Sequence, residues 1–496
     1  MRSPARRRLT WLGLALAVAG CAVGPNYVRP PTPAPPAAAF VSATPSAAST
    51  DQPPPDWWRL YDIPALDALV QEALVHNNSL LAAAANLVEV RAALSQARAG
   101  LFPSTGLSAG AQYGLTSEGT FIDELEGKAP PGPAPFYTDG LDVSYEVDLF
   151  GRVRRSIEAA HGDYQAQQAA ENVIRISVAG ETTRAYVDAC AYADELAVAR
   201  QSLDVVTQTY DITVSEARDG MASDLDVARA REEVEQVRAT LPTFEGNRRT
   251  ALFQLAVLTG QPPEQISQAD DACVTTPKLA AVLPVGDVGG LFRRRPDVRE
   301  AERQLAANTA RIGLATAGLY PTITIGASVS SFARSVSGLG SLNDLSYSIG
   351  PLLNWTFPNT LVALAQIREA RATASASYAN FQAAVLQALQ DTEDALTAYA
   401  GELDRNKALV GAHQASLTAF TLAREEYQLG RVSYLDLLTA QSDLVNASAA
   451  LAASDQAMAS DQVTVFKALG GGWEQAPAIT PLPILDGKTG KSTPVK

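Results

Sequence analysis

Gly-Met-Ala-Ser-Asp-Leu-Asp, at residues 220–226, recurs as Gly-Arg-Val-Ser-Tyr-Leu-Asp at residues 430–436. Two further pairs recur in the same order, namely Gly-Leu-Phe-Pro-Ser (100–104) with Gly-Leu-Tyr-Pro-Thr (318–322), and Leu-Thr-Gly (258–260) with Leu-Gly-Gly (469–471). Three ordered matches spaced by roughly 210 residues indicate a tandem duplication. The sequence therefore predicts one structural repeat at residues 57–282, a second at 283–475, and a tail at 476–496.

Two long stretches without proline, residues 152–219 and 361–429, predict two unusually long helices. Each helix would extend about 100 Å, which is too long for a compact domain. Packing residues recur every seven positions within them, as at Leu389, Leu396 and Leu403, and this spacing is typical of a coiled-coil seam. Shorter helices, expected to stack in pairs beside the long ones, are predicted at residues 64–100, 222–260, 287–318 and 433–470.

Four runs of roughly ten residues alternate apolar with polar side chains, as strands with one apolar face do. They are predicted at about residues 105–116, 139–150, 321–332 and 344–357. A tilted strand of this length crosses a bilayer, although a sheet covering a soluble core would show the same pattern. Since four strands cannot close a barrel and lipid tolerates no open edge, membrane strands would require further copies of the chain.

The N-terminus has the features of a signal peptide at residues 1–20: four arginines, then a short apolar run. Residues 18–21, Val-Ala-Gly-Cys, resemble the lipobox of bacterial lipoproteins, which implies that Cys21 is acylated and becomes the mature N-terminus. Signal cleavage beside an incidental cysteine is the alternative. The proline-rich residues 21–56 are expected to form an extended tether rather than a packed segment.

Composition argues against several function classes. A net charge of -14 does not suit nucleic-acid binding, and only three His and three Cys leave little for a metal cluster or a histidine-based catalyst. We expect no enzyme activity, no metal and no cofactor beyond the diacylglycerol and N-acyl lipid on Cys21. Cys190 and Cys273 are expected to remain unpaired, because one lies within a helix and the other in an irregular segment.

Several motifs extend over the mature chain in a familiar order, namely Cys-Ala-Val-Gly-Pro-Asn-Tyr (21–27), Trp-Trp (57–58), Arg-Arg-Pro-Asp-Val-Arg (294–299) and residues 430–437. With them the chain resembles the TolC-like outer-membrane efflux ducts of Gram-negative bacteria, in their lipoprotein branch. The resemblance implies a homotrimer with a closed 12-stranded β-barrel in outer-membrane lipid, continuous with a periplasmic α-helical barrel.

The same resemblance implies passive export of small toxic molecules. An inner-membrane pump, often of the resistance-nodulation-division class, would supply the energy through a periplasmic adaptor. An outer-membrane duct for type I secretion of proteins or peptides is the alternative. A long coiled-coil surface protein would explain the helices and the lipid but not the four strands.

Both heptapeptides fit sharp turns between antiparallel helices. A glycine with positive φ would end each long helix, and a serine with a carboxylate three residues later would begin the return helix. The resemblance places these turns at the periplasmic tip, where the duct contacts its adaptor: Gly220, Ser223, Leu225, Asp226, Gly430, Ser433, Leu435 and Asp436. Candidate gate residues lie just beside the turns: Asp211, Asp219, Arg424 and Tyr427. The carboxylates expected to line the barrel lumen are Asp142, Glu146 and Asp148.

Overall fold

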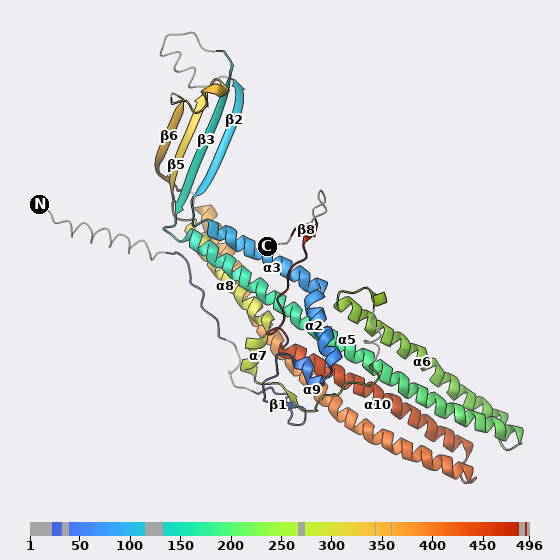
Figure 1. Cartoon of the computed structure of the whole chain (residues 1–496). Helices are drawn as coiled ribbons and strands as arrows, with labels where there is room; N and C mark the ends of the chain where they lie inside the picture. The colour runs from blue at the N-terminus through green and yellow to red at the C-terminus, as the bar shows by residue number, and fades with distance from the viewer. Residues whose placement is uncertain are drawn as a thin grey trace, which may run out of the picture. The chain divides into compact units, whose positions relative to one another are not determined.

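The structure, a computed structural model, describes residues 22–31, 39–114, 132–265, 273–342, 344–358, 360–485 and 492–493. Helices dominate it (Figure 1). The α-helices are α2 (Pro64–His76), α3 (Asn78–Ala99), α5 (Arg152–Arg218), α6 (Asp224–Leu258), α7 (Val288–Arg294), α8 (Pro296–Ala317), α9 (Leu361–Gln428) and α10 (Tyr434–Leu469). The strands are β1 (Ala48–Ser49), β2 (Ser104–Gly114), β3 (Ala134–Val147), β4 (Leu283–Pro284), β5 (Thr322–Ala333), β6 (Leu345–Asn354), β7 (Ile484–Leu485) and β8 (Ser492–Thr493). The predicted signal peptide and Cys21 lie outside the described residues.

The chain forms two compact units, each assembled from separate stretches of sequence. One contains Glu89–Gln165, Glu302–Asn380 and the chain up to Arg29. The other contains Pro30–Val88, Ala166–Ala301 and the chain from Phe381 onward. Helices α5 and α9 each run through both units. The two compact units therefore do not coincide with the two predicted repeats, which were defined by similarity of sequence.

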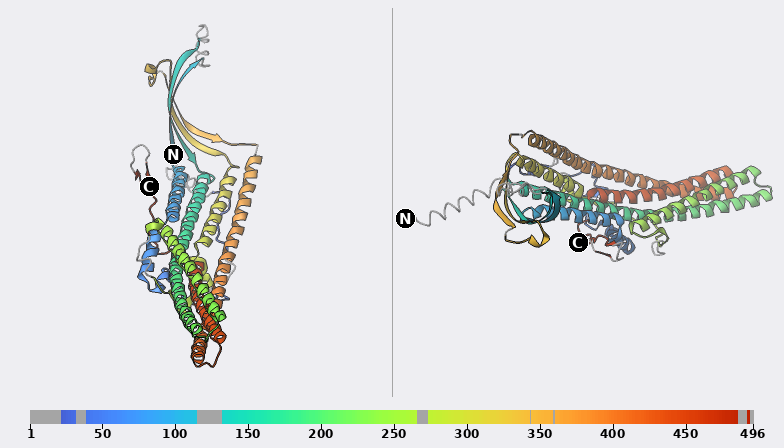
Figure 2. Two further views of the ribbon diagram at one scale, coloured as in Figure 1. Left: turned by 90° about the vertical axis from the view of Figure 1, so that its right-hand side faces the viewer. Right: turned by 90° about the horizontal axis from the view of Figure 1, so that it is seen from above.

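The first unit contains a four-stranded antiparallel sheet in the order β2-β3-β5-β6, seen as a curved sheet in Figure 2. Its register places polar residues opposite polar ones: Asp142 pairs with Ser328, whose Oγ lies 2.8 Å from that of Ser348. Val329 pairs with Tyr347, which is 81% exposed, and so belongs to an apolar face. The four predicted strands are therefore present, and within the described residues β2 and β6 each pair along one edge only.

The two long helices have almost the predicted ends. Helix α5 has 67 residues and α9 has 68, so each extends about 100 Å. The shorter helices follow the expected order, except that two of the predicted helices are divided, into α2 with α3 and into α7 with α8. None of the described helices carries a stretch that is both long and apolar enough to cross a membrane.

The main core lies in the second unit, and aromatic side chains anchor it. Trp57 is 1% exposed and stacks on Phe466 of α10 at 4.9 Å between ring centroids. Trp58 lies edge-on to Trp57, and its Nε1 donates to Asp67 of α2. Tyr399 of α9 is fully buried, and its hydroxyl donates to the carbonyl of Ala281. These contacts fix the irregular segments against the long helices.

The expectation of an unpacked N-terminal tether is wrong for residues 39–56, where Phe40 and Ala47 are buried and β1 pairs with β4, and for the segment Ala22–Arg29. Buried Arg155 of α5 donates to the carbonyl oxygens of Val23 and Gly24 and to Oδ1 of Asn26, at 2.9–3.2 Å. A guanidinium with several donors satisfies an extended backbone that has no ladder partner. Proline content predicts the extended conformation, but it does not indicate that a buried arginine donates hydrogen bonds to this segment.

Two further contacts hold this segment within its own unit. The Tyr27 hydroxyl donates to Glu302 at 3.0 Å, and Arg29 pairs with the same carboxylate at 3.3 Å. Gly24 has φ +88°, and a Cβ on it would lie 2.4 Å from the Cα of Gly313 in α8. The segment therefore packs directly on helix backbone. We call Ala22–Arg29 the N-terminal strap.

The expectation that Cys190 and Cys273 are unpaired is also wrong. They form a disulfide with a Cα–Cα distance of 5.0 Å. The segment after α6 returns along α5, where the backbone N–H and the hydroxyl of Thr276 both donate to Asp194. This return places Cys273 beside the fully buried Cys190, and its course could not be read from an irregular stretch of sequence.

Candidate functional site

The first heptapeptide forms the turn between α5 and α6. Gly220 has φ +77° and open space around it, so glycine is required for backbone conformation rather than for room. The backbone N–H of Met221 donates to the carbonyl of Glu216 at 2.8 Å, closing the end of α5. Ser223 and Asp226 form a reciprocal capping box, in which each side chain accepts from the other residue's N–H at 3.2 Å.

The second heptapeptide repeats this geometry between α9 and α10. Gly430 has φ +69°, and the N–H of Arg431 donates to the carbonyl of Glu426 at 2.9 Å. Ser433 and Asp436 form the matching capping box, with hydrogen bonds of 2.9 and 3.2 Å. The hydrogen bond from Ser433 lowers the pKa of Asp436. The turn chemistry predicted from sequence is thus present in both turns.

Four apolar side chains beside these turns are exposed to solvent: Met221 (73%), Leu225 (58%), Leu429 (63%) and Leu435 (51%). Exposed apolar groups that gather around well-ordered turns are a common feature of protein interaction sites. Leu225 and Leu435 occupy equivalent positions in the two heptapeptides, which gives each turn a similar surface.

The candidate gate residues do not all come together. The Tyr427 hydroxyl donates to Glu216 at 2.5 Å, which joins α9 to α5, and its ring packs edge-on to Tyr434. Burial, followed by the hydrogen bond to Glu216, raises the pKa of Tyr427. Arg424 lies 5.6 Å from the ring centroid of Phe420, and within the described residues it pairs with no carboxylate.

Asp211 and Asp219 form no ion pair among the residues that the structure describes. Of the four predicted gate residues, only Tyr427 therefore links two hairpins within the chain. The sequence does not single out Glu216, because one glutamate within a long helix has no distinguishing pattern. The feature of the sequence that points to Glu216 is its position, four residues before Gly220 and so about one helical turn from the end of α5.

The three predicted lumen carboxylates have different surroundings. Asp142 lies within β3 and forms no ion pair in the described part of the chain. Glu146 accepts from Nε of Arg152 at 2.7 Å. Asp148 lies beyond the end of β3, where it accepts from two backbone N–H groups of α5 and pairs with Arg154 at 3.2 Å. Asp148 is therefore a helix cap rather than a strand residue, and of these three carboxylates Asp142 alone lacks an ion pair within the described residues.

Comparison with known proteins agrees with this architecture. Residues 69–261 and 291–471 match the outer membrane efflux protein family. The chain belongs to this family. It is 30% identical to the toluene efflux pump outer membrane protein TtgC of Pseudomonas putida, with 92% of this chain and 94% of the relative aligned. It is 27% identical to the probable outer membrane lipoprotein SilC of Salmonella typhimurium, over 92% of this chain and 96% of the relative.

Among solved structures, the outer-membrane channel OprN superposes with a TM-score of 0.84 and 30% identity, covering 91% of this chain and all of that one. Family and fold together make this protein an outer-membrane efflux channel, as its motifs predicted. The channel fold explains why the sequence contains long coiled-coil helices and alternating strands.

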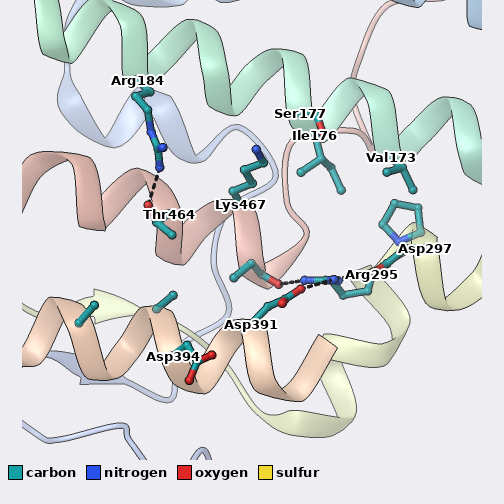
Figure 3. Close-up of a pocket in the computed structure, with 14 residues that line it drawn as sticks. Val173, Ile176, Ser177, Arg184, Arg295, Asp297, Asp391, Asp394, Thr464 and Lys467 are labelled. Carbon is teal, nitrogen blue, oxygen red and sulfur yellow. Dashed lines mark hydrogen bonds and ion pairs between the residues drawn. The ribbon is translucent and has the colours of Figure 1, made fainter. Parts of the chain in front are cut away.

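The Arg-Arg-Pro-Asp motif of this efflux channel lies between α7 and α8 and connects them to the end of α10 and to α9 (Figure 3). Arg295, between α7 and α8, donates to the carbonyl of Ala468 near the end of α10 and to the carboxylates of Asp297 and Asp391, at 2.6–2.9 Å. A cavity of about 590 Å³ lies beside it, lined by α5, α9 and α10. The motif thus has a structural role, because it satisfies the free carbonyl at the α10 C-terminus.

Proposed function

We propose that this protein is the outer-membrane channel of a tripartite efflux system and conducts small toxic molecules passively to the exterior. The observation that carries the proposal is one chain with a four-stranded sheet, apolar on one face, and helices of 67 and 68 residues that belong to the efflux family. It works as a homotrimer with a periplasmic adaptor and an inner-membrane pump, which supplies the energy. Outer-membrane lipid surrounds its sheet.

The assembly follows from the edges of the sheet. Strands β2 and β6 each have one edge without a partner in the described chain, and lipid forbids such an edge. Three copies, joined β6 to β2, close a barrel of twelve strands and bring their helices into a ring. Each half of the chain, residues 57–282 and 283–475, contributes one hairpin and one long helix with its return helix, as tandem duplication requires.

Anchorage and adaptor binding complete the proposal. Acylation of Cys21, in a mature chain that begins there, places the strap at the membrane; the likeness to SilC, described as a lipoprotein, supports this. The exposed apolar groups around Gly220 and Gly430 are the surface for the adaptor. No observation favours a protein-secretion duct over an efflux channel.

Deletion of the gene tests the function directly. Without the channel, at least one toxic compound should inhibit growth at a lower concentration than in the wild-type strain. Reintroducing the wild-type gene should restore the original tolerance. Unchanged tolerance combined with loss of a secreted protein would instead establish a secretion duct. Native mass spectrometry of the purified protein should give a trimer carrying three acyl-modified N-termini; an unmodified N-terminus would contradict only the lipid anchor.

A further inference from the structure

An unusual buried carboxylate lies on α5 within the second unit. Glu195 of α5 is only 7% exposed. In the described part of the chain no arginine, lysine or hydrogen-bond donor is paired with its carboxylate. Burial of a charged group without a partner costs several kcal/mol, so buried acids are normally paired, protonated or ligand-bound.

Glu195 lines a partly open cavity of about 250 Å³ between α5, α6 and α10. A second carboxylate, Glu233 of α6, lines the same cavity, and burial raises its pKa. No basic side chain contributes to the lining. The site therefore offers negative charge and room for a guest, without an internal cation to neutralise that charge.

The remaining walls combine an aromatic and aliphatic surface with amides. Phe244, Val198 and Val445 supply apolar area, and Asn446 and Gln236 supply amide groups. An apolar cavity of about 150 Å³ already admits a benzene ring. The present cavity is larger, so it has room for one aromatic ring and a short charged arm.

We propose that this cavity is a binding site for a small amphiphilic amine, whose ammonium group pairs with Glu195 while its apolar body packs against Phe244 and Val445. The ammonium group neutralises the acids, for which the cavity lining supplies no basic side chain, and the apolar wall selects an organic cation over a metal ion. The site goes beyond the channel function, since binding to the wall requires no transport. A guest there contacts α5, which ends at the first turn, and α6 and α10, which begin at the first and the second turn.

Binding is coupled to protonation of the acids. Burial, with Asp194 and Asp188 on the same helix, raises the pKa of Glu195 to about 7. Glu233 is the acid facing the cavity from α6, and α10 contributes no charged group to its lining. An ammonium guest pairs with the ionised carboxylate, so affinity should rise as pH rises through neutrality.

Calorimetry on the purified full-length channel tests the site with 2-phenylethylamine as the probe. The amine should bind, whereas 2-phenylethanol and phenylacetate, which share its size but lack the positive charge, should bind at least about tenfold more weakly. Glu195→Gln keeps the shape of the side chain and should weaken amine binding by at least about tenfold. Glu245→Gln, on an exposed position of α6, is the matched control and should bind like wild type.

Glu233→Gln provides a second variant should Glu195→Gln fail to assemble, and it should weaken binding as well. Equal affinity for the amine and the alcohol would overturn the proposal, because the acids would then contribute nothing. Full affinity in either Gln variant at the cavity would overturn it too. Neither outcome would affect the channel function, which is measured by tolerance of the deletion strain.

Discussion

At the scale of single residues, Glu195 makes the stability of the channel depend on pH. Burial, and then Asp194 and Asp188, raise the pKa of Glu195 from 4.5 to about 7. Between these two pH values the folded chain therefore keeps a proton that the unfolded chain has released. The free energy of unfolding should therefore fall as pH rises between these two values and level off above them. Glu195→Gln should remove this part of the dependence and be more stable than wild type at alkaline pH by about 2 kcal/mol.

Denaturant unfolding at a series of pH values measures this difference. Glu245→Gln again serves as the control and should follow the wild-type pH profile. Parallel profiles for wild type and Glu195→Gln would show that the carboxylate titrates normally in the folded protein.

The disulfide between Cys190 and Cys273 gives a second prediction at this scale. It closes a loop with a sequence separation of 83. The double variant Cys190→Ser/Cys273→Ser should unfold more readily by about 2–4 kcal/mol, since the unfolded chain regains loop entropy. Reductant should lower the thermal midpoint of wild type towards that of the variant. If a thiol-specific reagent labels Cys190 or Cys273 in the unfolded protein without prior reduction, the disulfide is absent.

At the scale of elements, the sequence predicts helices best where local chemistry decides their ends. Residues 152–219 and 361–429 lack proline and end at Gly220 and Gly430, so the helix ends fall within one residue of prediction. Strand β3 is less predictable, because it begins at Ala134 and leaves Asp148 to cap α5. Contacts between distant segments, such as Arg155 with the strap or Cys190 with Cys273, leave no local pattern to read.

The N-terminal strap is an element whose docking depends on one glycine. Gly24→Ala introduces a methyl group 2.4 Å from the Cα of Gly313 and strains a residue with φ +88°. The detached form of the strap should therefore be populated about tenfold more, and chymotrypsin should cleave the Tyr27–Val28 bond correspondingly faster. Mass spectrometry of the released N-terminal peptide measures this cleavage in the folded channel.

Gly340→Ala is the matched control for the strap, because it has a similar φ of +77° but open space around it. It should leave cleavage at Tyr27 unchanged. Equal resistance of Gly24→Ala and wild type would show that the strap accommodates the methyl group without leaving its site.

The polar face of the sheet predicts the ion preference of the pore. With Glu146 and Asp148 paired to Arg152 and Arg154, Asp142 is the one of the three predicted lumen carboxylates that has no ion pair in the described chain. The channel in a lipid bilayer should prefer cations, as pores lined by carboxylates do. Asp142→Asn should reduce the cation-to-anion permeability ratio more than Glu146→Gln does. Reversal potentials measure the ratio, and anion preference in wild type would mean that the other face of the sheet lines the pore.

At the scale of the whole molecule, three copies of each turn meet in the proposed trimer, and we expect the contacts between them to set the resting conductance. Within one chain Tyr427 joins the two hairpins through Glu216, whereas Arg424 and Asp219 form no ion pair in the described residues. These two charges are therefore available to pair between neighbouring protomers. Exposed ion pairs contribute about 1 kcal/mol each, and several of them, repeated by symmetry, favour a closed tip by several kcal/mol.

The isolated channel should accordingly conduct poorly, and Arg424→Ser or Asp219→Ala should raise its single-channel conductance without changing trimer assembly. Tyr427→Phe separates the two kinds of link, because it removes the hydrogen bond within a chain and leaves both charges in place. If the contacts between protomers close the tip, Tyr427→Phe should raise conductance less than Arg424→Ser does. The reverse order would place the closing contact within each chain, at Tyr427 and Glu216, and a wide pore in the wild-type trimer would exclude any resting closure at the tip.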